Sequence, residues 1–417
     1  MTVGVEAYPP QPVFESDFMG GALDSRLNFA RASNAWFRNA SGLLTQAASN
    51  TPRFDYDPAS LSLNGLLIEG QRTNIFLQSG NPGAWAKTNV TITSNAATAP
   101  DGTTTAALVT DTTASGFHNV QQNLSGSGTN WWSVYLKQGT IRYAVLAVPA
   151  NGNVTYSVLV DLQTGAFVSA QTNNSPSGTG YLIQNAGNGW WRVSVSQTAT
   201  GAIYPNIFLS TSATPVFVTA QPSYTGTGTG TIYVWGGQVE TASAFPTSYI
   251  PTTTTSATRA GDSLYTASLP WFNPAAGSFA LRAAGLGFAT ANASYLASFS
   301  DGTTANNISL FIASNGKAQG GAVVASSAYT SAATAGSPVS LTAFRQGLVY
   351  TAGANLAAFN GTLDGAGSWG SAAVPSGLTR LDLGNREDGT LAFNGWLQKF
   401  TCWNYALSSA KLQKVTA

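Results

Sequence analysis

The feature that most constrains the fold is a series of short runs in which apolar, often aromatic, residues alternate with polar ones. Gly, Asn, Asp, Ser and Pro separate these runs, which is the pattern of short β-strands joined by turns. The clearest runs are residues 132–136, 155–160, 191–195, 232–235 and 308–312. Helical periodicity is nearly absent, and the clearest helix candidate is 408–414, with Ser408 as its N-cap. The sequence therefore predicts an all-β protein.

The length of 417 residues is too great for one ordinary core and predicts two or three domains. Regularly spaced strands with turn signals between them are typical of β-sandwiches. We place an N-terminal region at 1–80 and a strand-rich block at 81–255, which ends in a Thr-rich stretch around Pro251. A second strand-rich block follows at 256–417. The 11 tryptophans argue against a disordered chain.

Charged residues make up 8% of the chain, about a third of the usual share, and the net charge is +1. So few charges cannot steer DNA or anionic lipid, so we expect neither as a partner. No apolar stretch approaches the roughly 20 residues of a membrane helix, and the N-terminus lacks signal-peptide features. We expect synthesis in a cytoplasm without secretion or membrane insertion. Cys402 is the only cysteine, which excludes an intrachain disulfide, and we expect it to be a buried thiol.

The first region carries an ordered series of motifs. They are NFARAS at 28–33, PRFDYD at 52–57, GLLIE at 65–69 and RTN at 72–74. The series resembles the N-terminal segment of many tail-fibre, head-fibre and minor structural proteins of tailed bacteriophages and prophages. Ala30 stands where that family usually has Thr. The resemblance implies that this region docks the chain on a virus particle.

The other two regions continue the resemblance. Trp85, GWWRV at 189–193 and VWGGQVE at 234–240 resemble the jelly-roll carbohydrate-binding modules of such proteins. FNGWL at 393–397 and WNYALS at 403–408 resemble a concanavalin-A-like or laminin-G-like sandwich. The implied architecture is an N-terminal docking region, a jelly-roll sandwich and a concanavalin-A-like sandwich.

Strand alternation indicates which aromatic residues could face a sugar. In run 131–137, Trp132 shares a face with Val134 and Leu136, which is the core face. In run 190–195, Trp191 shares a face with two valines by the same rule. Aromatic rings stack on sugars while polar groups bind the hydroxyls, so the opposite faces hold the candidates. These candidates are Trp131, Tyr135, Trp190 and Arg192. The alternative, which the sequence favours, is that this strand pair seals one sheet against a neighbouring domain or subunit.

Catalytic and metal-binding patterns are weak. His118 is the only histidine, so we interpret it as a hydrogen-bonded structural residue, with sugar contact as the alternative. Asp55 and Asp57 form a close carboxylate pair, as most glycosidases need, but ion pairing and turn formation explain it better. We therefore expect no enzyme and no cofactor. The turn dipeptides at 101–102 and 301–302 leave a structural calcium ion open.

These observations favour a virion structural protein, a tail or head fibre or spike, that displays carbohydrate-binding sandwiches for host attachment. The expected partners are a host-surface polysaccharide, other virion proteins through the Pro-rich arm at 8–12, and further copies of the chain in a homo-oligomer. Multivalent display would raise weak sugar affinity by roughly 10²-fold or more. Two alternatives remain: a purely structural decoration or connector protein, and a polysaccharide depolymerase with an intersubunit site.

Overall fold

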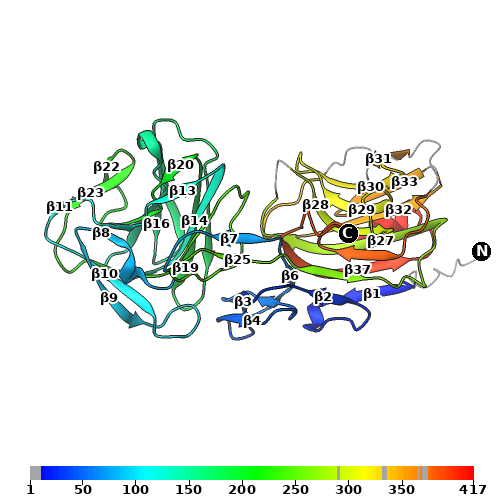
Figure 1. The fold of residues 1–417 in the computed structure, drawn as a ribbon, viewed down its shortest axis with the longest axis horizontal. Coiled ribbons are helices and arrows are strands. Elements are labelled where there is room, and N and C mark those ends of the chain that lie inside the picture. The colour runs from blue at the N-terminus through cyan, green and yellow to red at the C-terminus, as the bar shows by residue number, and fades with distance from the viewer. Residues whose placement is uncertain (1–10, 289–291, 331–335, 353, 364–366, 369–373) are drawn as a thin grey trace, which may run out of the picture.

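The computed structural model describes residues 11–288, 292–330, 336–352, 354–363, 367–368 and 374–417. Two β-lobes lie side by side, and strands β7 (Arg72–Asn74) and β25 (Ala257–Arg259) run between them (Figure 1). The predicted all-β fold is confirmed. The first three residues of the predicted Pro-rich arm lie outside the described residues.

The first lobe is a jelly-roll sandwich of two six-stranded sheets. One sheet runs in the order β18 (Gly180–Asn185), β19 (Trp190–Thr198), β14 (Thr129–Gln138), β24 (Thr231–Glu240), β10 (Ala106–Asp111) and β9 (Val90–Ala97). The other runs β17 (Ala166–Asn173), β16 (Thr155–Asp161), β15 (Tyr143–Ala147), β21 (Asn206–Ser210), β12 (Asn119–Gln121) and β8 (Ala86–Thr88). Trp132, Val134 and Leu136 lie in the core between the sheets, as strand alternation predicts.

The second lobe is a concanavalin-A-like sandwich of a nine-stranded and a seven-stranded sheet. The main path of the larger sheet is β34 (Thr362–Leu363), β33 (Ala354–Phe359), β32 (Ala343–Thr351), β27 (Ala276–Gly285), β37 (Gly395–Trp403), β6 (Leu63–Ile68) and β5 (Phe54–Tyr56), with β1 (Phe14–Asp17) beside β37 and β35 (Gly367–Ser368) beside β33. The smaller sheet runs β2 (Asn28–Ala30), β26 (Ser263–Thr266), β36 (Arg380–Leu383), β28 (Ser294–Ser300), β29 (Asn307–Ile312), β30 (Ala318–Val324) and β31 (Ser327–Thr330).

The predicted C-terminal helix is present as α1 (Ser409–Thr416), and Ser408 caps it by accepting a hydrogen bond from the Lys411 backbone N–H. The helix packs on the outer face of the nine-stranded sheet, where Leu412 joins Trp403 in a small apolar cluster. Gly347 lets the helix approach, because a Cβ at this position would lie 2.8 Å from Thr416 Cγ2.

The predicted boundary at residue 80 does not separate a domain. Strands β1 and β6 both pair with β37, and β2 pairs with β26, so the N-terminal region completes the second lobe. Phe14, Leu66 and Ile68 belong to the same core as Phe400. The hairpin of β3 (Ala35–Arg38) and β4 (Leu44–Ala47) extends toward the first lobe.

A buried ionic network, which we call the joint, lies where the two lobes meet. It consists of Arg31, Arg53, Glu69, Arg259 and Asp262, all with essentially no exposed side-chain surface. Arg53 contacts Glu69 at 2.7 Å and Asp262 at 2.5 Å, while Arg31 contacts the other Asp262 oxygen at 3.1 Å. Glu69 also accepts hydrogen bonds from the Ser248 backbone N–H (2.8 Å) and hydroxyl (2.6 Å), in the segment that leaves the first lobe.

The motifs of the N-terminal region are therefore parts of one structural unit. Arg31 comes from NFARAS, Arg53 from PRFDYD and Glu69 from GLLIE. Asn74, from RTN, donates to the Ile250 carbonyl (2.7 Å) and accepts from the Val239 N–H (2.9 Å), which ties β7 to the first lobe. The joint and Asn74 therefore connect the N-terminal region to the segment that leaves the first lobe. A cavity lies beside the joint.

Candidate functional site

A cavity of about 370 Å³ lies between the two lobes and is lined by all parts of the chain. The first lobe contributes Tyr135, Leu182, Ile183, Gln184, Asn185 and Arg192; the N-terminal region contributes Phe37, Arg38, Leu44, Asp55, Tyr56, Asp57, Pro58, Asn64 and Leu67; the second lobe contributes Leu286, Leu341 and Trp396; and the connecting segment contributes Pro246–Tyr249. We call this cavity the cleft. Its volume falls within the range of small-molecule sites, and its lining mixes aromatic with hydrogen-bonding side chains.

At one wall of the cleft, two guanidinium groups lie near the Tyr135 ring. Arg38 is 5.9 Å and Arg192 is 5.7 Å from the centre of its ring. Arg38 is held by the carbonyls of Gly42 and Ala186, each at 3.0 Å. Arg192 donates from Nη2 to the Ser133 hydroxyl at 3.1 Å, but its buried Nε has no hydrogen-bond partner among the described residues. A buried donor without a partner is costly, and it marks where a ligand acceptor could bind.

The two acids of the cleft have structural partners. Asp55 accepts from the Arg38 backbone N–H at 2.7 Å and from the Trp396 indole N–H at 2.9 Å, so both of its oxygens are engaged. Burial raises the pKa of Asp55, and these hydrogen bonds oppose the rise. Asp57 accepts from the backbone N–H groups of Ala59 and Ser60, which is the predicted turn role. Although burial opposes it, hydrogen bonding at Ser60 and Ala59 lowers the pKa of Asp57.

The structure places the five predicted sugar contacts in three different environments. Tyr135 and Arg192 both line the cleft, although the two residues are only 2% and 9% exposed and the Tyr135 ring belongs to a buried cluster. Trp190 is 1% exposed, and it packs with Tyr135, Leu44 and Tyr249 in a second core on the outer side of this sheet. The prediction that Trp190 offers a ring to a sugar is wrong, because the N-terminal hairpin and the connecting segment cover it. The alternative of packing against a neighbouring part of the protein is what the structure shows for this ring.

Trp131 and His118 lie outside the cleft. Trp131 is 9% exposed, and its indole N–H has no partner among the described residues. His118 is fully buried, stacks on Tyr224 with ring centres 4.2 Å apart, and has Nε2 3.2 Å from the Thr112 carbonyl oxygen. This is the structural histidine that we favoured, and its burial argues against sugar contact.

Other predicted chemical features are structural. Cys402 is buried, as expected. Asp101 and Asp301 each accept from a backbone N–H two residues on, in the predicted turns. Within the described ranges, no three His, Cys, Asp or Glu side chains are grouped to hold a metal ion. In the same ranges, the structure contains no helix with the length and apolar character needed to cross a bilayer.

Sequence reasoning missed Arg38 and Trp396 as cleft residues. Each residue lies in or near a motif that the sequence analysis had noted. Arg38 lies between NFARAS and PRFDYD, and Trp396 lies within FNGWL. Neither signal indicated that the two residues meet at Asp55, because that contact joins positions 341 residues apart.

No family model matches the chain, and no curated protein matches it. Solved structures with a partial likeness include the CBM40 of the Ruminococcus gnavus IT-sialidase bound to alpha2,3 sialyllactose, at 16% identity and a TM-score of 0.30 over 34% of this chain and 85% of that chain. Domain 4 of AbnA, an extracellular arabinanase from Geobacillus stearothermophilus in complex with arabinotriose, aligns at 13% identity and a TM-score of 0.33, over 38% and 73%. Trypanosoma rangeli sialidase in complex with the inhibitor DANA aligns at 10% identity and a TM-score of 0.30, over 75% and 60%. The fold described above rests on the hydrogen-bonding pattern of this chain.

Proposed function

We propose that this protein is a structural component of a tailed phage particle, a fibre or spike, that attaches to a surface polysaccharide through the cleft between its lobes. The observation that carries the binding role is the unpartnered Arg192 Nε in a cavity lined by the half-buried rings of Tyr56 and Trp396. Rings of this kind can pack against a sugar, and the guanidinium can donate to its hydroxyls. The virion role is supported by the motif series of the N-terminal region.

We propose binding and not catalysis. A glycosidase of the usual kind needs one carboxyl group free to donate a proton and a second free to act on the sugar or a water. Both Asp55 oxygens accept hydrogen bonds from structural groups, and Asp57 closes a turn. Neither acid is left free to fill such a role in this chain.

The binding role is tested on a panel of purified bacterial surface polysaccharides, using the full chain in its native oligomeric state. The test variant combines Tyr135→Phe with Arg192→Gln, which removes the hydroxyl and the unpartnered donor. Its matched control combines Tyr143→Phe with Arg142→Gln, because these form a similar cation–π pair with an exposed guanidinium, centred 5.5 Å from the ring. We expect wild type and control to bind one panel member, and the cleft variant to lose at least tenfold in affinity while keeping its circular dichroism spectrum.

The other outcomes separate the alternatives. A polysaccharide that becomes shorter during incubation would establish a depolymerase. If wild type binds no panel member, the purely structural role of a decoration or connector protein would replace attachment. The particle location is tested independently by immunogold electron microscopy, with antiserum against this chain, on phage particles from the source culture.

A further inference from the structure

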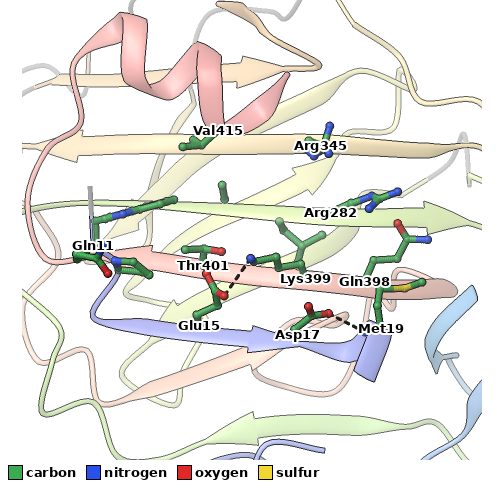
Figure 2. Close-up of a pocket in the computed structure, with 14 residues that line it drawn as sticks. Gln11, Glu15, Asp17, Met19, Arg282, Arg345, Gln398, Lys399, Thr401 and Val415 are labelled. Atoms are coloured by element: carbon green, nitrogen blue, oxygen red, sulfur yellow. Dashed lines mark hydrogen bonds and ion pairs between the residues drawn. The ribbon is translucent and has the colours of Figure 1, made fainter. Parts of the chain in front are cut away.

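A second hollow, which we call the trough, lies on the outer face of the nine-stranded sheet. Its volume is about 530 Å³, and strands β1, β37, β27 and β32 form its floor (Figure 2). The C-terminal end of α1 borders it through Val415. It shares no lining residue with the cleft, so it requires its own explanation.

The trough contains a row of three cations in direct cross-strand register. Lys399 on β37 is paired with Arg282 on β27, and Arg282 is paired with Arg345 on β32. Figure 2 shows all three on successive strands. Neighbouring strands lie about 4.8 Å apart, and like charges directly opposite each other destabilise a sheet. The row therefore opposes folding.

Only the two outer cations of this row are compensated. Lys399 forms an ion pair with Glu15 at 3.0 Å. Arg345 donates to the Ala417 carbonyl oxygen at the end of α1, where the helix dipole is negative. The exposed Arg282 side chain, between them, makes no hydrogen bond or ion pair with any described residue. A local conflict of this kind, without a compensating contact, is expected at functional sites.

A second observation indicates that the ligand of the trough also carries hydroxyl groups. Gln398 is 8% exposed, and its Nε2 donates to the Asn64 carbonyl at 2.9 Å. Its buried Oε1 has no donor among the described residues, and its side chain lies at the same end of the trough as Arg282 (Figure 2). Glu15 and Asp17 add further acceptors to the lining. Acceptors beside a free guanidinium suit a ligand that offers hydroxyl donors as well as a carboxylate.

We propose that the trough is a binding site for a carboxylated sugar of an acidic polysaccharide, with Arg282 holding the carboxylate. The planar guanidinium can donate two parallel hydrogen bonds to it. Lys399 and Arg345 add longer-range attraction, while Gln398 accepts from a neighbouring hydroxyl. This site is independent of the cleft and has its own ligand chemistry.

The test uses the full chain and three carboxylated polymers: polygalacturonate, alginate and polysialic acid. Each is compared with its carboxyl-reduced, neutral form by affinity electrophoresis. The variants are Arg282→Gln, Arg282→Lys and the control Lys87→Gln, which removes the same charge from an exposed position on the other lobe. We expect wild type and control to bind at least one carboxylated polymer and not its neutral form. Arg282→Gln should lose at least tenfold in affinity, and Arg282→Lys should lose less.

Three results would overturn the proposal: no binding of any polymer by wild type, equal binding of the neutral form, or full binding by Arg282→Gln. Sedimentation velocity covers the alternative that the trough meets an acidic group of a second copy. A change of oligomeric state in Arg282→Gln would assign the trough to a protein interface and would also overturn the proposal. Loss of binding in the cleft variant but not in Arg282→Gln would support the cleft and reject the trough, so the two proposals fail separately.

Discussion

Replacement of Glu69 by Gln should strongly destabilise the protein. Glu69 and Gln have nearly the same shape, so the change removes charge without leaving a cavity. In the native protein, Glu69 compensates Arg53 and Arg259, and all three side chains are buried. Removing one partner of a buried ion pair costs about 3–5 kcal/mol. Arg53 keeps its ion pair with Asp262, but Arg259 is left without a carboxylate partner among the described residues, so we expect a cost within that range.

The effect should also depend on pH in a definite direction. Burial by itself would raise the pKa of Glu69, but Arg259, Arg53 and the Ser248 hydrogen bonds outweigh it and hold the pKa well below its usual range. A carboxyl group whose pKa is lowered by folding contributes stability above its unfolded-state pKa of about 4.3 and loses it as the pH falls. The difference in unfolding free energy between wild type and Glu69→Gln should therefore be full at pH 7 and shrink progressively below about pH 4.3.

Urea unfolding followed by tryptophan fluorescence, from pH 7 to pH 3, measures this difference. Asp24→Asn is the control, because Asp24 pairs with the half-exposed Arg26, and such surface pairs contribute about 0–1 kcal/mol. If Glu69→Gln lies within about 1 kcal/mol of wild type at pH 7, below the range for breaking a buried pair, the joint is not held together by charge. A difference that grows as the pH falls would refute the assigned pKa direction.

Three further changes test other parts of the structure. Trp190→Ala should destabilise the first lobe by about 3–5 kcal/mol, since the ring is buried in a core; retention of wild-type stability in urea would show that the ring is dispensable. Gly347→Ala should loosen α1, because the new Cβ would meet Thr416 Cγ2 at 2.8 Å and Leu412 Cδ1 at 2.9 Å; hydrogen exchange at 409–416 should speed up, and unchanged protection would contradict this packing. Cys402 should react with a thiol reagent at pH 8 only after unfolding, because burial raises its pKa well above the usual value; rapid labelling of the native protein would show that the thiol is accessible.

The strands and their core faces could be predicted because alternation is a local property. Trp132 and Trp191 each share a strand face with an aliphatic residue two positions along the chain, and both contribute to the core between the sheets. The same rule assigned Trp190 and Tyr135 to the opposite face. It could not show what covers that face, because the covering residues, such as Leu44 and Tyr249, are distant in sequence.

The joint shows the same limit for charged residues. The motif arginines were interpreted as part of a docking region, since a motif near the N-terminus indicates no partner within the chain. Arg31 and Arg53 instead pair with Asp262, 231 and 209 residues away. A sequence in which charge is rare does indicate that each charge has a defined role, but only the fold shows which roles are structural.

The charged residues fall into those that stabilise the fold and those that do not. The chain has only 18 Lys and Arg and 17 Asp and Glu. Five of these charged residues form the joint, where each buried charge faces an opposite one. Five more line the trough, where three cations stand in one row and the central one lacks a partner within the described chain. Since removing Arg282 relieves repulsion on both sides, Arg282→Gln should keep or slightly raise the unfolding midpoint. A lower midpoint would mean that Arg282 stabilises the sheet, and the argument that it is retained for binding would fail.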